Sequence, residues 1–173
     1  MPDWSKVICV VTGMGYDPYP ADATWEGLRP YLQQYVAQGW DLYVVTWDDL
    51  IKVLTEDLPS SLMAIKQVII IGHSWGAYAS TQLVAELNVR SMPVHGWMCL
   101  DGVDHDALFG CGFGEVWPVP ANVAHAASYS GIGATLQGSQ VEAQVHDLFC
   151  GHNSFMTRPD VLAKIEEWVR SAT

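Results

Sequence analysis

Basic residues are scarce in this chain of 173 residues, in which Lys and Arg number 8 against 19 Asp and Glu. The formal net charge is therefore −11. Nucleic-acid phosphates and anionic lipid headgroups repel a protein of that charge. We expect no nucleic-acid partner.

Long hydrophobic runs and a leader segment are also missing from the sequence. The apolar runs 7–11 and 68–71 are far shorter than the roughly 20 residues that a membrane-spanning helix needs. The first six residues lack the basic segment and the following apolar segment of a secretory signal. We expect a cytoplasmic protein without a membrane span.

Cysteine is sparse, with four residues and no C-x-x-C spacing. Zinc-binding and thioredoxin-like sites are thereby disfavoured, and we expect neither a metal ion nor a cofactor. Cys9 and Cys99 lie in apolar runs, where a free cysteine acts as a small hydrophobe. A disulfide between Cys111 and Cys150 stays open.

What the sequence does contain is an alternation of strand-like and helix-like segments in one domain, residues 1–173. Half the residues are apolar and 16% are charged, as in a globular protein. β-Branched and apolar runs predict strands, and apolar residues at helical spacing predict helices. The predicted strands are 6–12, 41–47, 67–72, 94–100, 122–129 and 141–149. The predicted helices are 24–38, a short one within 48–61, 74–87 and 159–170, with a long irregular stretch at 102–120.

This order of segments predicts an α/β three-layer sandwich around a mostly parallel sheet of about six strands. Right-handed crossovers place the ligand site of such a sheet at the carboxyl ends of its strands. Residues in the loops that follow the strands are therefore the candidates for function.

One such loop carries the motif G-x-S-x-G, as Gly72-His73-Ser74-Trp75-Gly76. It joins the most strand-like run of the chain to a predicted helix, which is the context of a nucleophile elbow. The tight turn strains the serine backbone and presents the hydroxyl at the tip of the sheet, beside the positive end of a helix. We predict that Ser74 is a nucleophile.

A serine hydroxyl needs a base, which is usually histidine. His152 lies just after the last predicted strand and before the last helix, on the same edge of the sheet as Ser74. We expect His73 to be structural, with its side chain pointing away from that of Ser74. The other histidines are His95, His125 and His146 in predicted strands and His105 in the long loop.

The base needs an acid to hold its tautomer, and the chain order in this arrangement is Ser, acid, His. Asp101 ends the strand that follows the elbow, and we favour it. Asp104 and Asp106 follow closely and compete with it. The more usual position, after the next strand, falls in 130–140, which contains no Asp or Glu. Glu142 is a weak substitute at the start of the last strand, and Asp147 lies too deep inside it.

An oxyanion would need two backbone donors. We expect the N–H of Trp75, directly after the nucleophile, and the N–H of Met14, in the loop after the first strand, with Gly13 permitting close approach. Aromatic residues could add an apolar acyl pocket. These are Phe109, Phe113 and Trp117, together with Trp75.

With these motifs the chain resembles the α/β-hydrolase superfamily, and in particular its small lipase- and thioesterase-like members. The resemblance rests on Thr12-Gly13-Met14-Gly15, the elbow at Ser74, Leu100-Asp101-Gly102 and Gly151-His152. It implies a minimal hydrolase fold with strand order 2-1-3-4-5-6 and no large lid. Thr12 stands where larger members often have His.

The resemblance implies a serine hydrolase that cleaves an acyl ester or thioester of a small molecule through an acyl-enzyme. An amidase or peptidase could use the same three residues. A binding protein of the same fold, without catalysis, is the third interpretation. The sequence leaves the natural substrate and the oligomeric state open.

Overall fold

A sheet of six parallel strands forms the centre of the computed structural model, which describes residues 5–13, 23–49, 65–103 and 115–172. Its strands are β1 (Lys6–Thr12), β2 (Asp41–Thr46), β3 (Gln67–His73), β4 (Val94–Leu100), β6 (Val123–Ser130) and β8 (Val141–His146). They lie in the order β2-β1-β3-β4-β6-β8. Counted along the chain, this is 2-1-3-4-5-6, so the predicted size and order of the sheet are confirmed.

The strands read as unbroken apolar runs because the sheet is covered on both faces. Alternate side chains of β1 enter different cores: Val7, Cys9 and Val11 belong to one, Ile8 and Val10 to the other. The same alternation runs through β3, where Ile70 and Ile71 belong to different cores. A side chain's position in its strand therefore determines which layer it faces.

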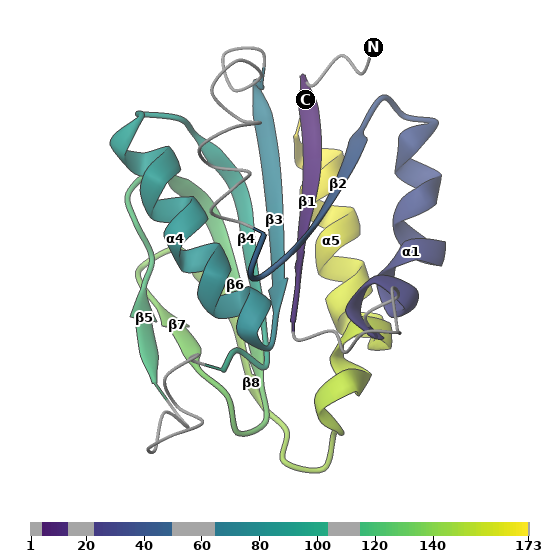
Figure 1. Ribbon diagram of the computed structural model, residues 1–173, viewed down its shortest axis with the longest axis vertical. Coiled ribbons are helices and arrows are strands. Elements are labelled where there is room, and N and C mark those ends of the chain that lie inside the picture. The colour runs from purple at the N-terminus through teal and green to yellow at the C-terminus, as the bar shows by residue number, and fades with distance from the viewer. Residues whose placement is uncertain (1–4, 14–22, 50–64, 104–114, 173) are drawn as a thin grey trace.

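Helices form those two outer layers (Figure 1). Helix α4 (Trp75–Val89) covers one face, and α1 (Ala23–Val36) and α5 (Pro159–Ser171) cover the other. A short 3-10 helix, η4 (His152–Thr157), precedes α5. Each predicted helix in this part of the chain is present, with ends that differ by at most two residues. Gly39 adopts a φ of 85° just beyond α1, as expected of a helix C-cap.

The structure contains a second sheet that the sequence did not predict. Strands β5 (Val116–Pro118) and β7 (Thr135–Gln137) form a second, two-stranded parallel sheet. Strands of three residues are too short to show a periodicity, so the stretch 102–120 read as irregular. The short helix predicted within 48–61 lies outside the described residues, except at its first two positions.

The last strand also ends earlier than predicted, at His146. The carboxylate of Asp147 accepts a hydrogen bond from the N–H of Phe149 at 3.0 Å, which closes a turn and ends the strand. The prediction that Asp147 lies inside the last strand is therefore wrong. Asp147 lies in the turn that leads to η4.

Close contact between α4 and β1 holds the start of α4 against the sheet. A methyl group on Gly76 would lie 2.5 Å from the carbonyl oxygen of Thr12 and closer still to that of Val11. Neither carbonyl can yield, since both belong to the β1 backbone.

We expect Gly76→Ala to lower the free energy of unfolding by roughly 3 kcal/mol, because the added methyl overpacks a rigid backbone contact. Chemical denaturation measures the loss. Gly151→Ala is the matched control, since its methyl would meet only the flexible Ser154 hydroxyl at 3.3 Å. Equal stability of the two variants would contradict this account of the helix–sheet contact.

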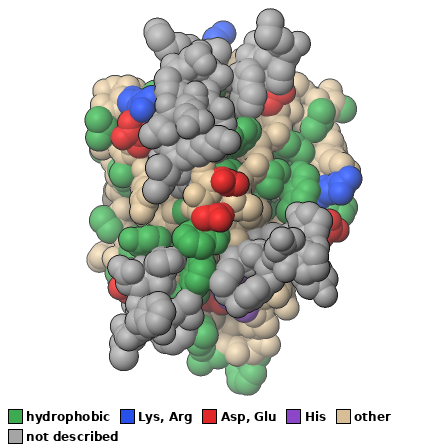
Figure 2. Space-filling view, in the orientation of Figure 1, with side chains coloured by type: hydrophobic (Ala, Val, Ile, Leu, Met, Phe, Trp, Pro, Cys, Tyr) green, Lys and Arg blue, Asp and Glu red, His purple; other side chains and the backbone are tan. Residues whose placement is uncertain are grey.

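The surface fits the acidic composition. On the face shown in Figure 2, acidic side chains lie near the middle, and the Lys and Arg side chains lie apart from one another at the rim. Among the described residues of this face, the basic side chains therefore form no concentrated patch of the kind that binds a phosphate backbone. None of the helices in the described ranges is long and apolar enough to cross a membrane.

Candidate active site

Ser74 occupies a strained turn between β3 and α4. Its φ of 56° and ψ of −128° form a conformation that L-residues seldom adopt. Hydrogen bonds fix this turn on both sides: the N–H of Ser74 donates to Leu100 O at 3.1 Å, and its carbonyl accepts from Ala77 N at 3.0 Å and Val103 N at 3.1 Å. The surrounding backbone thus maintains the strain, which is a common property of functional turns.

Gly13, at the end of β1, lies directly against this turn. A methyl group built there would come within 2.9 Å of Ser74 Cβ and 3.4 Å of Ser74 Oγ. The absence of a side chain at position 13 therefore leaves room beside the hydroxyl. The role predicted for Gly13 beside an oxyanion donor depends on Met14, which lies outside the described residues.

Asp101 follows β4 and is the most tightly held carboxylate at this edge. Its side chain is 3% exposed, and its φ of 43° turns the chain away from the strand. Oδ1 accepts hydrogen bonds from the N–H groups of Gly131 at 2.9 Å, Ile132 at 3.3 Å and Gly133 at 3.0 Å. The Ser130 hydroxyl adds a fourth donor at 3.4 Å. With Oδ1 saturated, Oδ2 is directed to another partner.

That partner is His152, the first residue of η4. Its Nδ1 lies 2.6 Å from Asp101 Oδ2. An ionised carboxylate can only accept, so Nδ1 carries the proton and the neutral ring keeps its lone pair on Nε2. The side chain of His152 is 40% exposed. A ring that is protonated on Nδ1 and has a lone pair on Nε2 is the tautomer that a general base requires.

His73 is next to Ser74 in the chain and next to His152 in the structure. The rings of His73 and His152 lie with centroids 4.6 Å apart, and His73 immediately precedes Ser74. Among the described hydrogen bonds of His152, none joins it to Ser74 Oγ. Such contacts are often long in unliganded enzymes and shorten when substrate binds.

The pKa of Asp101 reflects this setting. Burial alone would raise it, but the hydrogen bonds from His152 and from the amides of Gly131 and Gly133 outweigh burial, and they lower the pKa from 3.8 to about 2. The folded state therefore holds the ionised carboxylate more strongly than the unfolded chain does.

Because the folded-state pKa is depressed, the stabilisation is fully present above pH 4 and is lost as the pH falls toward 2. We expect it to amount to about 2 kcal/mol, from 1.36 kcal/mol per pKa unit. Urea titrations at several pH values measure how the free energy of unfolding falls with pH. Asp101→Asn should remove the part of this fall that comes from Asp101. An unchanged slope in the variant would assign the acid sensitivity to other carboxylates.

The competing acids in the described ranges have other partners. Asp147 pairs with Arg158 at 2.7 Å. Glu142 lies near the amino end of β8, where it binds His125, Lys164 and the indole N–H of Trp168. Asp104 and Asp106 lie outside the described residues.

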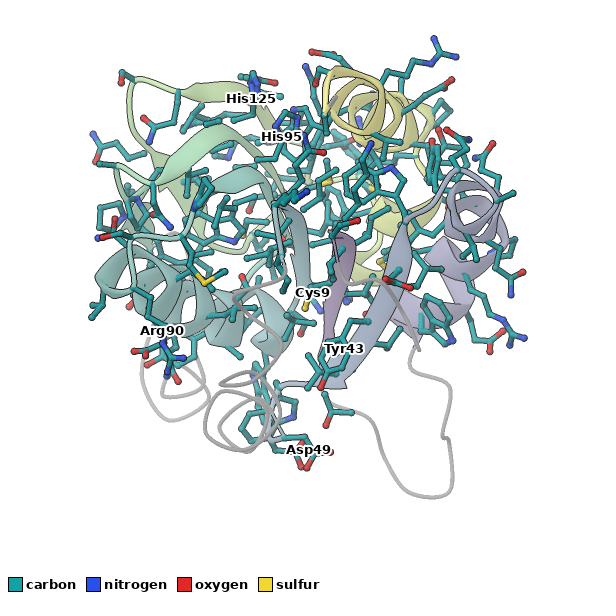
Figure 3. The ribbon with its side chains drawn as sticks, turned by 90° about the horizontal axis from the view of Figure 1, so that it is seen from above. Cys9, Tyr43, Asp49, Arg90, His95 and His125 are labelled. Carbon is teal, nitrogen blue, oxygen red and sulfur yellow. The ribbon has the colours of Figure 1, made fainter. Side chains whose placement is uncertain are left out.

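Other histidines lie away from the site or pack structurally. His95 and His125 come near the amino ends of β4 and β6, and their rings lie edge to face with centroids 5.2 Å apart (Figure 3). Ser74 follows the carboxyl end of β3, so these two rings belong to the opposite edge of the sheet. His146 ends β8, and His105 is outside the described ranges.

Only some of the residues predicted for an acyl pocket and an oxyanion hole lie in the described part of the chain. Trp75 begins α4, and its ring meets that of Trp47 edge to face at 5.0 Å. Trp117 is 8% exposed and packs in the core beside α4, 6.0 Å from the ring of Tyr78. Its ring is thus core packing instead of an open pocket wall. Met14, Phe109 and Phe113 lie outside the described residues.

Two features of the site were missed from the sequence. The stretch 130–140, which lacks an acid, supplies the N–H groups that hold Asp101 instead. The signal for it was Gly131-Ile132-Gly133, because a Gly-x-Gly turn after a strand can point successive N–H groups at one anion. His73, expected to be only structural, also contacts the His152 backbone.

Metal and disulfide chemistry receive no support within the described ranges. They contain no group of three or more His, Cys, Asp or Glu side chains arranged to hold a metal ion. Cys150 is a free thiol, and Cys111, its suggested disulfide partner, lies outside the described residues. The buried Cys9 and Cys99 have pKa values raised to about 12 by burial, which keeps them as inert thiols.

Comparisons with known proteins add no family to this picture. A scan against models of protein families and a search of curated proteins found no match to the chain.

Proposed function

We propose that this protein is a serine hydrolase that cleaves an acyl ester or thioester, with Ser74 as nucleophile, His152 as base and Asp101 as acid, on a minimal α/β-hydrolase fold without a large lid. The observation that carries the proposal is the 2.6 Å contact between His152 Nδ1 and Asp101 Oδ2, next to a serine in a strained strand–helix turn. Residues 74, 101 and 152 come from three separate segments of the chain. A histidine with only a structural role would require neither a serine nearby nor the strained turn at Ser74.

Proton transfer follows from the tautomer. His152 Nε2 takes the proton of Ser74 Oγ as the hydroxyl attacks the acyl carbonyl, and the imidazolium that forms is stabilised by Asp101. Asp101 stays ionised, since its pKa is near 2. His152 then returns the proton to the leaving group, and water resolves the acyl-enzyme by the same two proton transfers in turn.

The oxyanion would lie between the start of α4 and the end of β1. The N–H of Trp75 and the positive end of the α4 dipole support the charge from one side. Gly13 leaves space on the other side, and the N–H of Met14 is the second donor that we propose. Donors that are already oriented before substrate binds lower the barrier most, and the N–H of Trp75 belongs to the start of α4.

Labelling by a fluorophosphonate probe tests the proposal directly. The probe needs an activated serine, so we expect one adduct per chain, mapped by mass spectrometry to the peptide that contains Ser74. Denatured protein is the control and should not react. Folded protein that stays unlabelled would support the non-catalytic binding interpretation and reject the hydrolase.

A panel of p-nitrophenyl esters, acyl thioesters and anilides then separates the substrate classes. We expect turnover of esters and thioesters with short or medium acyl chains. Faster turnover of the anilides would instead identify an amidase or peptidase built on the same three residues.

A further inference from the structure

His73 is buried between the nucleophile turn and the segment that carries the base. Its side chain is on the α1 side of the sheet, like Ile69 and Ile71 before it, and the residue is 2% exposed. Nδ1 lies 2.7 Å from the hydroxyl of Thr24, the second residue of α1. Nε2 lies 3.1 Å from the main-chain carbonyl oxygen of His152.

The chemistry of these partners fixes the protons. A carbonyl oxygen can only accept, so Nε2 of His73 carries a hydrogen and donates it to His152. The hydroxyl of Thr24 can donate to the lone pair of Nδ1 when His73 is neutral. Thr24, His73 and the His152 backbone thus form a directed chain of hydrogen bonds across the packed layer.

The contact with His73 is one of those that hold the start of η4, whose later residues Phe155 and Met156 are buried in the core. The side chain of His152 is 40% exposed, and the six-residue helix η4 that this residue begins has no side-chain cap at Gly151. Asp101 holds the ring through Nδ1 and leaves the main chain to other contacts. Ring and main chain must both be held before Nε2 can keep a constant position relative to Ser74.

His73 links Ser74, the proposed nucleophile, to His152, the proposed base. It is bonded covalently to Ser74 and hydrogen-bonded to the main chain of His152. A displacement of η4 away from the sheet at His152 would break this contact at His73. A donor elsewhere on β3 would not be coupled so directly to the strained turn.

We propose that His73 is a positioning residue, which sets the spacing of Ser74 and His152 through its hydrogen bond to the His152 carbonyl and is itself oriented by Thr24. This role rests on the proposed hydrolase function. His73 does not transfer a proton in the reaction, because both of its ring nitrogens already have partners within the protein.

The test compares variants that keep or remove the donor. His73→Phe keeps a planar ring without nitrogen, and His73→Gln keeps a side-chain N–H near the position of Nε2. We expect His73→Phe to slow the second-order rate of fluorophosphonate labelling on the order of 100-fold, the effect of a displacement of about 1 Å in a catalytic group. His73→Gln should recover most of that rate.

Thr24 provides a second pair that keeps the test decisive if His73→Phe does not fold. Thr24→Val removes the hydroxyl at nearly constant volume, and Thr24→Ser retains it. We expect Thr24→Val to slow labelling several-fold and Thr24→Ser to label close to the wild-type rate. Equal rates for Val and Ser would overturn the role of Thr24 as the group that orients His73.

A readout independent of turnover is the downfield proton NMR signal of His152 Nδ1–H in its bond to Asp101. We expect its exchange with water to speed up in His73→Phe and to recover in His73→Gln, because a displaced main chain weakens that bond. A thermal melt of each variant separates this local change from general loss of stability.

The two proposals fail in different ways. If the wild-type protein is not labelled, the hydrolase proposal fails, while the NMR signal still reports whether His73 positions His152. If the wild type is labelled and His73→Phe keeps both the labelling rate and the slow exchange, the positioning role is wrong. Equal losses in His73→Phe and His73→Gln, with unchanged melting temperatures, would also reject it.

Discussion

Ser74→Ala is expected to reduce ester hydrolysis by about 10⁴- to 10⁶-fold, the range found when a triad nucleophile is removed. Alanine has no oxygen to attack the acyl carbonyl, and residual turnover comes from water held by the oxyanion donors. Initial rates with a p-nitrophenyl ester measure the loss, and fluorophosphonate labelling should disappear with it.

The control must separate loss of the nucleophile from loss of the fold. Ser154→Ala is matched, because Ser154 is an exposed serine in η4, two residues from His152. It should keep both labelling and turnover. If Ser74→Ala retains substantial turnover while labelling is lost, the hydrolytic water does not depend on an acyl-enzyme at Ser74, and the proposed mechanism is wrong.

The turn itself adds a stability test to the same position. A non-glycine residue in a rarely populated conformation costs about 1–3 kcal/mol. Ser74→Gly removes that strain and the hydroxyl together, so we expect it to unfold at a temperature no lower than that of Ser74→Ala. This outcome would indicate that the protein maintains the strained serine at the expense of stability.

Asp101→Asn is expected to lower turnover on the order of 10³- to 10⁴-fold, as the loss of the acid does in a Ser-His-Asp site. The structure explains why the amide cannot substitute. If its oxygen faces the N–H groups of Gly131 and Gly133, its NH₂ faces His152 Nδ1 and favours the wrong tautomer. If it flips, its NH₂ opposes those N–H donors instead.

The first orientation replaces a hydrogen bond to a charged carboxylate by a neutral one, and the second leaves buried N–H groups without an acceptor, so Asp101→Asn should also lose about 1–3 kcal/mol of stability. Rates and urea denaturation of the same preparation measure both effects. Asp147→Asn is the control, because Asp147 is near the same edge but pairs with Arg158. Loss of turnover in Asp104→Asn, with Asp101→Asn nearly active, would transfer the role of acid to Asp104.

The sequence by itself determined the strands of the sheet and the turn at Ser74. β1 and β3 could be recognised because a strand buried on both faces must be apolar at every position, which is a local property of the chain. The turn at Ser74 could be recognised by its glycines. They stand where close contacts leave no room for a side chain, as between Gly76 and Thr12. Each of these signals lies within a few consecutive residues.

The tertiary structure alone decided how the rest of the site is assembled. Asp101 and His152 are separated by 51 residues, and their contact depends on the turn 131–133, which fixes Oδ1 and directs Oδ2. The roles of His73 and Thr24 likewise follow from the packing of α1 and η4 against one face of the sheet. Hydrogen bonds between distant segments leave no periodic pattern in the sequence, so the partners of each group emerge only when the layers are packed.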